Sequence, residues 1–459
     1  DATAALKITL QNLTCAGHNA YVLFVGIMKA FDSVNHDMLW KILAKYGIPE
    51  NMIRTIKKMY TDIHVTLQVG KEKEEFMSTS GVKQGDNLAP LLFLFVIQAA
   101  IEMMQESWPT KLPDLQYSPN EWDPKTGTLK QPSSLTCWST NRKQLVQLRH
   151  NQSFYADDSA FIFLSLEDLI IGTKHVRDHF KQFGLQIHLG TRSTMPGVQD
   201  IKSKMEAMYF PPYEMRKAEI PENLWTGSYD IGDGQFVSFC QAFWYLGTFL
   251  TPTLDDNFDI DSRITAATKA FYSMRNILLN KRIKLSFRVQ FYLAIPVNIL
   301  LWGSDSWALS TDLCRKLKTC HNKFTRRLCG ITRWHCREYH ISMNDIFEWL
   351  NITSIDKIID LQMICFLKKV AMQPLTRLTR RIMNSQAVPV EGYKLPKNRL
   401  STRKTYKDVL VRAGMTKSGH LDEWIPKLQN KANNSIMEEN LGLPKGSISR
   451  KKMQSRTTE

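Results

Sequence analysis

Residues 154–158 read Phe154-Tyr155-Ala156-Asp157-Asp158, and an apolar run continues from there to Phe163. Two apolar arms around neighbouring carboxylates predict a β-hairpin with the acids at its tip. Carboxylates held this close repel each other and lose hydration, so they are costly unless a cation lies between them. Mg2+ is the natural candidate, because it prefers oxygen ligands and often also holds substrate phosphates. Taken alone, a solvated turn is the more common interpretation of such a pair.

Two further segments carry weaker signals. The loop Ser80-Gly81-Val82-Lys83-Gln84-Gly85 precedes a predicted apolar helix at 91–104, and its glycines allow close approach of the backbone to a ligand. Lys83 can meet a phosphate, and Gln84 can hydrogen-bond a base or sugar. Lys29-Ala30-Phe31-Asp32 follows a short buried strand predicted at 21–25. On their own, a helix-opening turn and a core aromatic residue beside a helix N-cap explain these segments.

The patterns along the chain predict three parts. Strands and helices interleave as far as about residue 210, which predicts an α+β layer in residues 1–250. Apolar residues then keep helical spacing, which predicts a helical region at 251–330. Residues 331–459 form a basic C-terminal extension without a motif that we can assign. Residues 108–151, rich in Pro, Ser, Thr and Asn, predict a long exposed insertion within the first part.

The order of the three segments is more specific than any one of them. Lys29 to Asp32, Gly81 to Gly85 and Tyr155 to Asp158 resemble three successive blocks in the palm of the reverse transcriptases of non-LTR retrotransposons. The resemblance extends over about residues 4–330. It implies a right-hand polymerase palm with partial fingers, a helical thumb-like region, and RNA-templated DNA synthesis. The expected partners are an RNA template, a DNA primer and deoxynucleoside triphosphates.

The resemblance also implies roles for individual residues. Asp157 and Asp158 match metal ligands of a two-metal Mg2+ site that is catalytic for phosphoryl transfer. Lys204 matches a lysine that assists the departure of pyrophosphate, although a solvated lysine explains it as well.

Four other residues match positions that contact the nucleotide or template. Phe31 matches the aromatic gate that rejects a 2′ hydroxyl group. Gln84 and Gly85 match the loop that lines the nucleotide and the template, and Tyr155 matches a position beside them.

One departure from the family pattern bears on activity. The first metal-binding aspartate is expected five residues before Phe31, and this chain has Gly26 there. Glycine supplies no oxygen ligand, and Asp32 lies beyond the predicted strand end. Loss of a ligand costs several kcal/mol of transition-state stabilisation, and each ~1.36 kcal/mol is about tenfold in rate. We therefore predict an incomplete metal site and weak or absent activity, and we interpret the chain as a fragment of a decayed element.

The net positive charge of the chain is consistent with a nucleic-acid partner. The formal net charge is +16 and the pI is about 9.4, which favours a polyanion. A predicted helix at 313–328 carries a basic face suited to phosphates, and a solvated face explains it equally. The C-terminal basic residues, including Arg399, Arg403, Lys404 and Arg450-Lys451-Lys452, predict a disordered arm for nucleic acid, a nuclear address or a solvated tail.

The cysteine content and the lengths of the apolar stretches argue against other classes of protein. Eight cysteines are too sparse for a disulfide-rich secreted protein, so we expect a reduced, intracellular setting, either nuclear or cytoplasmic. Cysteines and His321 crowd residues 314–336, but no pair there has the C-x2-4-C spacing of a zinc site, so we expect no zinc. The longest apolar stretches fall short of the ~20 residues that span a bilayer, so we expect no membrane segment.

Two alternatives to an active polymerase remain open at this stage. The first is a non-catalytic nucleic-acid-binding remnant of such an element, which Gly26 favours. The second is a maturase-like RNA-binding protein that does not polymerise.

Overall fold

The fold is described from a computed structural model. The residues that it describes are 2–61, 63–117, 122–123, 128–129, 146–193, 199–215, 219–374, 376–383, 385–396, 400–417 and 421–449.

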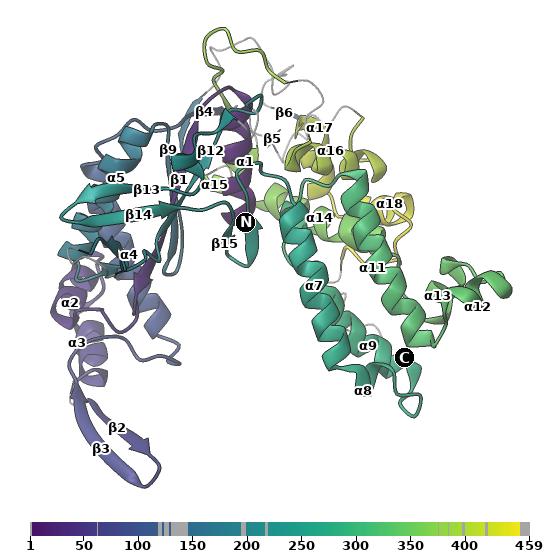
Figure 1. Ribbon diagram of the computed structural model, residues 1–459, viewed down its shortest axis with the longest axis horizontal. Coiled ribbons are helices and arrows are strands. Elements are labelled where there is room, and N and C mark those ends of the chain that lie inside the picture. The colour runs from purple at the N-terminus through teal and green to yellow at the C-terminus, as the bar shows by residue number, and fades with distance from the viewer. Residues whose placement is uncertain are drawn as a thin grey trace.

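A mixed sheet forms the centre of the N-terminal half (Figure 1). The strand order is β11-β14-β12-β1-β9-β8, with β10 paired to β1 and β13 paired to β14. The strands are β1 Ala20–Met28, β8 Gln152–Tyr155, β9 Asp158–Phe163, β10 Gln186–Ile187, β11 Gly190–Thr191, β12 Glu206–Phe210, β13 Ser228–Gly232 and β14 Gln235–Phe239. β1 is central and pairs antiparallel with both β9 and β12, which is why its first six residues are buried.

Both faces of β1 are covered. Leu23 and Val25 point into a core shared with the helices α2 His36–Lys45, α4 Ala89–Glu106 and α5 Leu166–Gln182. Val22 and Phe24 belong to a second core, which continues through α1 Ala2–Cys15 into the helices of the C-terminal half. A strand buried on both faces is a continuous apolar run, as the sequence of this segment is.

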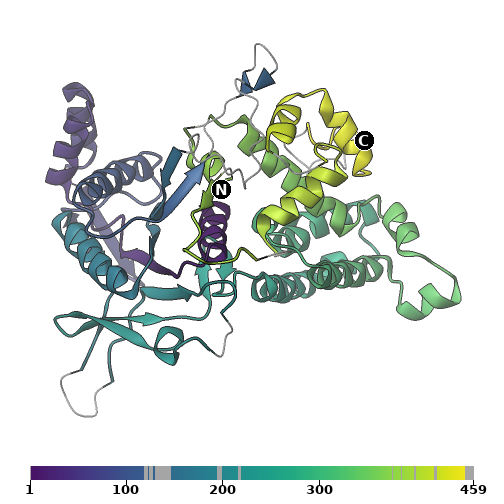
Figure 2. The ribbon, with the colours of Figure 1, turned by 90° about the horizontal axis from the view of Figure 1, so that it is seen from above.

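Helix α1 is the element that joins the two halves. It lies between the sheet and the C-terminal helices in both ribbon views (Figures 1 and 2). Ten of its 14 residues are buried, including the polar Lys7 and Gln11. A helix buried on all sides belongs to the interior of a large unit.

The second half is mainly helical after the hairpin of β15 Phe243–Tyr245 and β16 Thr248–Leu250. α9 runs without a break through the π-helical segment η3 into α10. The helical elements are α7 Asn257–Ser273, α8 Arg275–Leu278, α9 Leu285–Tyr292, η3 Leu293–Val297, α10 Asn298–Leu300, η4 Ser304–Ser306, α11 Thr311–Cys329, α12 Arg333–Glu338, α13 Met343–Trp349, α14 Ile355–Met372, α15 Leu378–Met383, α16 Thr402–Arg412, α17 Leu421–Gln429 and α18 Asn433–Asn440. The short α6 Glu222–Trp225 precedes β13.

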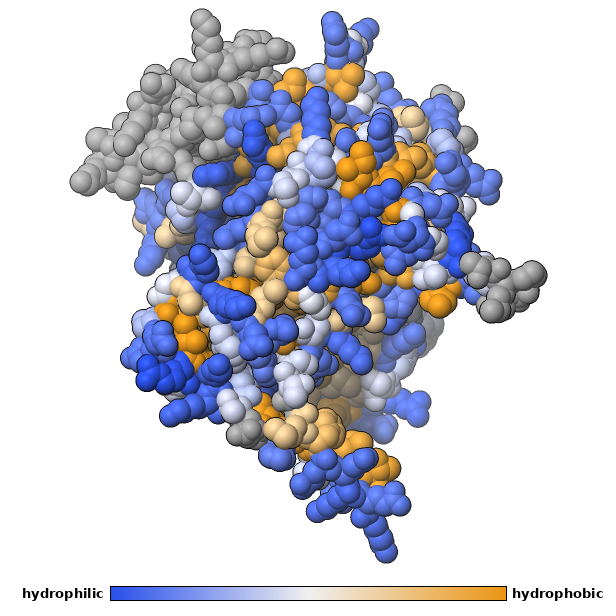
Figure 3. Space-filling view, turned by 90° about the vertical axis from the view of Figure 1, so that its left-hand side faces the viewer, coloured by the Kyte–Doolittle hydropathy of each residue, from blue (hydrophilic) through white to orange (hydrophobic). Residues whose placement is uncertain are grey.

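A hairpin projects from the body below α2 and α3 Glu50–Met59 (Figure 1). Its strands are β2 Ile63–Val69 and β3 Glu72–Ser78. Val65, Leu67 and Phe76 on this hairpin are exposed. The view onto this side shows orange side chains among blue ones near the projection (Figure 3).

The prediction of an exposed insertion at 108–151 is wrong for both of its ends. β4 Asp114–Tyr117 pairs with β7 Val146–Arg149 and with β17 Ser385–Ala387 from the C-terminal part. Leu115, Leu148 and His150 are buried, because this small sheet packs near α1. The sequence between these ends lies outside the described residues, apart from the strand pair β5 Trp122–Asp123 and β6 Thr128–Leu129.

One helix in the described ranges, α4, is long and apolar enough by length and composition to cross a membrane. It packs against α2 and α5, and eight of its residues are buried in the core. A core helix of a folded domain has the same composition, and α4 occupies that position.

Candidate active site

The strand register brings two separated sequence segments together. In the pairing of β1 with β9, Val25 lies opposite Ser159 and Gly26 lies opposite Asp158. Directly opposite residues of an antiparallel pair share a face, with Cβ atoms ~4.5–5.5 Å apart. Asp158 therefore lies beside the end of the strand that carries the glycine. The metal-site interpretation depends on the acidic hairpin tip lying next to residue 26, and the strand register places them next to each other.

The predicted hairpin with acids at its tip is confirmed. β8 and β9 pair from Gln152 with Phe161 to Tyr155 with Asp158, and Ala156 and Asp157 form the two-residue connection. Ala156 has φ 54°, in the left-handed region that suits two-residue hairpin loops but favours glycine. The Tyr155 side chain is 64% exposed.

The two aspartates differ in their surroundings. Partial burial, with the charge of Asp157 second, raises the pKa of Asp158 above its ordinary value. An unpaired carboxylate that is losing hydration beside a like charge is stabilised by a cation. The donor set of two carboxylates therefore fits a hard divalent ion such as Mg2+.

Gly26 leaves space for a third carboxylate. A Cβ atom built on Gly26 meets no heavy atom within 4 Å. Its backbone lies in an ordinary strand, so a side chain there would be unstrained. Among the described residues, no group of three or more His, Cys, Asp or Glu side chains gathers to hold a metal ion. The pair at the hairpin tip is thus one ligand short of such a group.

The other two predicted segments pack directly against each other. The Val82 amide donates to the Phe31 carbonyl at 2.7 Å, and the Gln84 amide group donates to Asp32 Oδ1 at 3.2 Å. Gly81 has φ 87°, and a Cβ there would lie 2.9 Å from the Cα of Asp32, so only glycine fits this approach. The loop at 80–85 is consequently fixed to the turn that follows β1.

Individual side chains of these segments lie as follows. Phe31 is half-buried and stacks on Phe93 of α4, with ring centroids 5.0 Å apart. Lys83 donates to the Met59 carbonyl at 2.9 Å, at the end of α3, so its ammonium group is already engaged. Gly85 is exposed with φ 92°, and nothing lies within 4 Å of a Cβ there.

Lys204 lies two residues before the start of β12. Its backbone amide donates to the His188 carbonyl at 3.2 Å, and the residue is exposed. Two residues further on, Glu206 pairs with Phe24 on β1. Lys204 is therefore near the carboxyl end of β1, on the opposite side from β9.

A cavity of about 1250 Å³ contains the acidic hairpin tip. Its walls come from α1, the turn between β15 and β16, the segment around α10 and η4, and helix α14. The lining residues are Ala2, Thr3, Ala4, Tyr155, Ala156, Asp157, Asp158, Leu246, Gly247, Thr248, Asn298, Leu301, Trp302, Gly303, Ser304, Asp305, Ser306, Gln362, Cys365, Phe366 and Lys369. The structure thus brings Tyr155, Asp157 and Asp158 into one cavity. Phe31, Gln84, Gly85 and Lys204 are not among its lining residues.

Reasoning from the sequence missed part of this wall. Trp302 lies against Gly247, because a Cβ on Gly247 would be 2.4 Å from the indole Nε1 atom. Gln362 and Lys369 come from α14, in a part of the chain for which the sequence contained no assignable motif. Trp302 closes the apolar run at 294–302 and was the available signal, but tryptophan is also common in cores.

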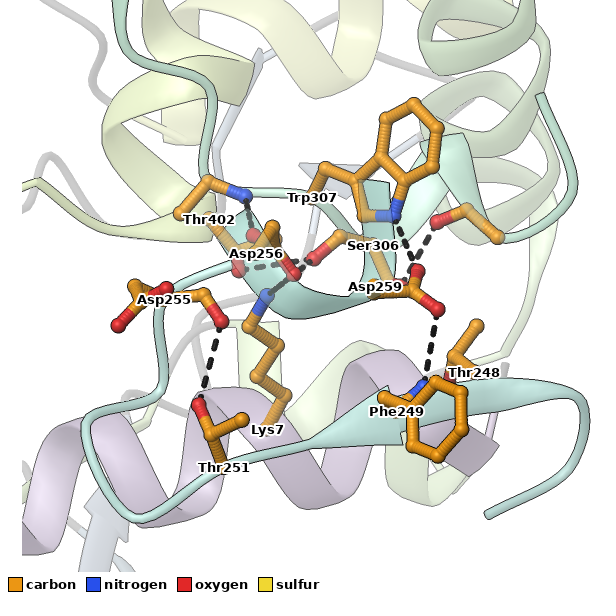
Figure 4. Close-up of polar contacts among 12 residues, drawn as sticks. Lys7, Thr248, Phe249, Thr251, Asp255, Asp256, Asp259, Ser306, Trp307 and Thr402 are labelled. Atoms are coloured by element: carbon orange, nitrogen blue, oxygen red, sulfur yellow. Dashed lines mark hydrogen bonds and ion pairs between the residues drawn. The ribbon is translucent and has the colours of Figure 1, made fainter. Parts of the chain in front are cut away.

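A buried polar network holds the wall in place (Figure 4). Lys7 of α1 forms an ion pair with Asp256, and Asp256 also accepts the Ala308 amide. Asp259 accepts the Phe249 amide at 3.0 Å and the Trp307 indole at 2.9 Å. Desolvation by burial raises the pKa of Asp259 despite these donors. The two aspartates at the start of α7 therefore connect α1, the β15–β16 hairpin and the segment after η4.

The basic face predicted on α11 is partly neutralised. Arg315 pairs with Asp312 at 2.9 Å, Lys316 with Asp261 at 2.8 Å and Lys318 with Asp356 at 3.1 Å. In the C-terminal part, Arg403 donates to backbone carbonyls, and Lys404 lies in α16. Arg399 and residues 450–452 lie outside the described residues.

Comparison with known proteins identifies the domain. A family model described as "Reverse transcriptase (RNA-dependent DNA polymerase)" matches residues 3–190. The Pol polyprotein of the type-2 retrotransposable element R2DM from Drosophila melanogaster is 32% identical over 87 residues, which is 19% of this chain and 8% of the relative. The Pol polyprotein of the type-1 element R2 from Nasonia vitripennis is 34% identical over 106 residues, 23% of this chain and 10% of the relative. Residues 3–190 form a reverse transcriptase domain that is similar to those of non-LTR retrotransposons.

A third relative, from the type-1 element R2 of Popillia japonica, is 31% identical over 103 residues, 22% of this chain and 17% of the relative. The matches therefore span less than a fifth of the length of each of these three relatives. The reverse transcriptase domain gives the central sheet its identity as a polymerase palm, and enzymes of this family use a divalent metal such as Mg2+. The resemblance stated from the three sequence blocks is confirmed.

Proposed function

We propose that this chain binds a primed RNA template and deoxynucleoside triphosphates at the cavity beside the Asp157–Asp158 tip, as an RNA-directed DNA polymerase domain. The observation that carries the proposal is the register that places Asp158 opposite Gly26. In the proposal, β2–β3 and α3 serve as partial fingers and residues 251–330 serve as the thumb-like region. Residues 331–459 are the basic extension, and the chain works inside the cell.

Asp157 and Asp158 are the residues that would hold Mg2+. When bound, Mg2+ supplies Lewis-acid stabilisation of the charge that develops on the transferred phosphoryl group. The residues of the chain itself would position the nucleotide and the template. The loop at 80–85, fixed to Asp32, would orient the nucleotide and template through Gln84 and Gly85, and Phe31 would limit the sugar pocket. Lys204 would face the departing pyrophosphate.

Gly26 makes the proposed site incomplete. The position faces open space and supplies no oxygen, so the two remaining acids must hold the cation with one negative charge fewer. Such a loss is expected to cost several kcal/mol of transition-state stabilisation, or at least about 100-fold in rate. We therefore propose that this copy extends primers weakly or not at all.

A second function, a non-catalytic nucleic-acid-binding remnant, is favoured by the same residue. The net charge of +16 supports binding to a polyanion whether or not the chemistry survives.

Primer extension on an RNA template tests the proposal with three proteins: the unchanged chain, Gly26→Asp and Gly26→Asn. Because asparagine has nearly the size of aspartate without its charge, it separates filling the space from supplying a carboxylate. We expect Gly26→Asp to extend at least about 100-fold faster than the other two. Measurable extension at equal rates by the unchanged chain and Gly26→Asp would contradict the role of Gly26. If none extends while all three bind the primed RNA, the binding remnant is supported.

A further inference from the structure

A continuous helical segment carries an exposed apolar face. α9, η3 and α10 run from Leu285 to Leu300, and one side of them, including Val289, Tyr292 and Leu300, is buried. The opposite side, together with the turn just after α10, carries five mostly large apolar residues that follow one another at intervals of three or four positions. We call these five residues the aromatic stripe: Phe287, Phe291, Ile295, Asn298 and Trp302. Phe287 is 52% exposed, Phe291 41% and Trp302 57%, so large apolar groups face solvent along the segment.

One end of the aromatic stripe is part of the catalytic cavity. Asn298 and Trp302 line the cavity that also contains Asp157 and Asp158. Since residues three or four apart lie on one helix face, Ile295, Phe291 and Phe287 continue that wall outward. At ~1.5 Å per residue, the helical stretch from Asn298 to Phe287 carries the aromatic stripe about 16 Å from the cavity.

The other end of the aromatic stripe meets a basic loop. Lys281, Arg282 and Lys284 precede α9, and all three are exposed. Buried Arg288, in the first turn of α9, donates to the carbonyls of Leu278 and Leu328, so the start of α9 is held against the ends of α8 and α11. Aromatic side chains that continue into exposed cations combine two features that single-stranded nucleic acid requires, a surface for bases and neutralisation of phosphates.

We propose that the aromatic stripe binds a single-stranded segment of nucleic acid that leads to or from the cavity, with its phosphates near the basic loop. Phenylalanine has no hydrogen-bonding group, so it cannot read base edges, but it can stack on the face of any base. In a duplex these faces are stacked on each other and are not available. A single strand therefore fits the exposed rings better than a duplex does, and binding should tolerate any base sequence.

The inference rests on the proposed function for the identity of the cavity, but binding tests it without any need for catalysis. The probes are fluorescently labelled single-stranded RNA, single-stranded DNA and an RNA–DNA hybrid of the same length. The variant is Phe287→Ala/Phe291→Ala, and the matched control is Trp334→Ala, which removes a ring that is 58% exposed on α12. Thermal melting establishes that each variant is folded.

We expect the double variant to bind single strands at least about tenfold more weakly, while the hybrid changes less than threefold and the control changes nothing. The dependence of binding on salt should stay the same, because no phosphate contact is lost. Lys281→Ala/Arg282→Ala/Lys284→Ala should instead weaken binding and flatten the salt dependence. Comparison of the RNA and DNA probes then tells which strand is held.

Three outcomes overturn the inference. The first is unchanged single-strand binding by Phe287→Ala/Phe291→Ala. The second is an equal or greater loss with the hybrid, which would mean that the face holds a duplex. The third is an equal loss of binding in Trp334→Ala, which would mean that any exposed ring contributes to binding, whether or not it belongs to the aromatic stripe. Failure of primer extension alone would contradict only the proposed function. It would not contradict this inference, because binding to the aromatic stripe does not depend on Asp157, Asp158 or residue 26.

Discussion

Gly26 and Asp158 lie directly opposite each other on the neighbouring antiparallel strands β1 and β9. The position of Gly26 is open, and Asp158 is already disfavoured in its charged form by burial and by Asp157. A carboxylate added at residue 26 would therefore enter a site with unbalanced negative charge.

Gly26→Asp should make folding stability depend on divalent metal. Without metal, a third carboxylate repels the other two, so we expect a lower melting temperature than that of the unchanged chain in EDTA. With Mg2+ or Mn2+ at ~100 times its Kd, binding to the folded state adds about 2.7 kcal/mol, so the order should reverse. Thermal melting across a metal titration measures both effects. A metal response of the same size in Gly26→Asn would show that charge at this position is irrelevant.

The ion pair of Lys7 with Asp256 should be essential for joining the two halves of the molecule. Asp256→Ala leaves the Lys7 ammonium group buried without its partner, which should cost ~3–5 kcal/mol in the free energy of unfolding. Lys316→Ala breaks an exposed pair with Asp261 and should cost less than about 1 kcal/mol. Urea denaturation measures both. Similar losses of unfolding free energy in the two variants would show that the buried Lys7–Asp256 pair is no more important for stability than an exposed pair.

Two buried histidines should make the chain sensitive to acid. Burial lowers the pKa of His150 and of His321 from 6.5 to about 4. Both rings stay neutral in the folded chain down to about pH 4, whereas in the unfolded chain they bind protons below about pH 6.5. The unfolded state then holds more protons, so stability is complete above pH 6.5 and falls as the pH drops toward 4.

At pH 5 each histidine should lower the free energy of unfolding by about 2 kcal/mol relative to pH 7.5. Urea denaturation at the two pH values measures this difference. His321→Gln should lose part of the pH dependence, although its stability at pH 7.5 also falls because the hydrogen bond with Tyr292 changes. His64→Gln, on the exposed β2–β3 hairpin, is the control and should keep the full dependence. An undiminished dependence in His321→Gln would rule out His321 as a contributor.

Gly172 should tolerate no side chain. A Cβ on this residue of α5 would lie 2.0 Å from the Phe163 ring on β9, which is fully buried. Gly172→Ala should therefore destabilise the fold by ~1–3 kcal/mol, even though alanine favours helices. Gly26→Ala is the matched change in open space and should stay within ~0.5 kcal/mol. The midpoints of urea denaturation compare the two, and equal midpoints would contradict a packed contact at Gly172.

Much of the domain could be predicted from the sequence, because its signals are local. The apolar run of β1, the hairpin β2–β3 and the helix α4 follow from periodicity within single segments. The acidic tip between β8 and β9 was predicted for the same reason, since a two-residue loop between apolar arms is a short-range pattern. The roles of Phe31, Gln84, Gly85, Tyr155 and Lys204 came only from the resemblance and stay predictions.

Other features depended on contacts between distant segments. The ends of the insertion are buried because β4 pairs with β17, more than 250 residues away, and no local pattern reveals this partner. Lys83 was a candidate for phosphate, yet the fold places its ammonium group on the carbonyl of Met59. α14 lines the cavity only because the C-terminal part packs back onto α1.

By itself, the sequence determined the kinds of elements, the order of the three blocks and the absence of a carboxylate at residue 26. These depend on residue types and on short spacings, which the chain carries whether or not it is folded. The tertiary structure alone decided that Gly26 faces Asp158 and that the aromatic stripe runs out of the cavity. Strand register and helix packing are set by burying apolar surface across the whole chain, so they place residues that no local pattern can bring together.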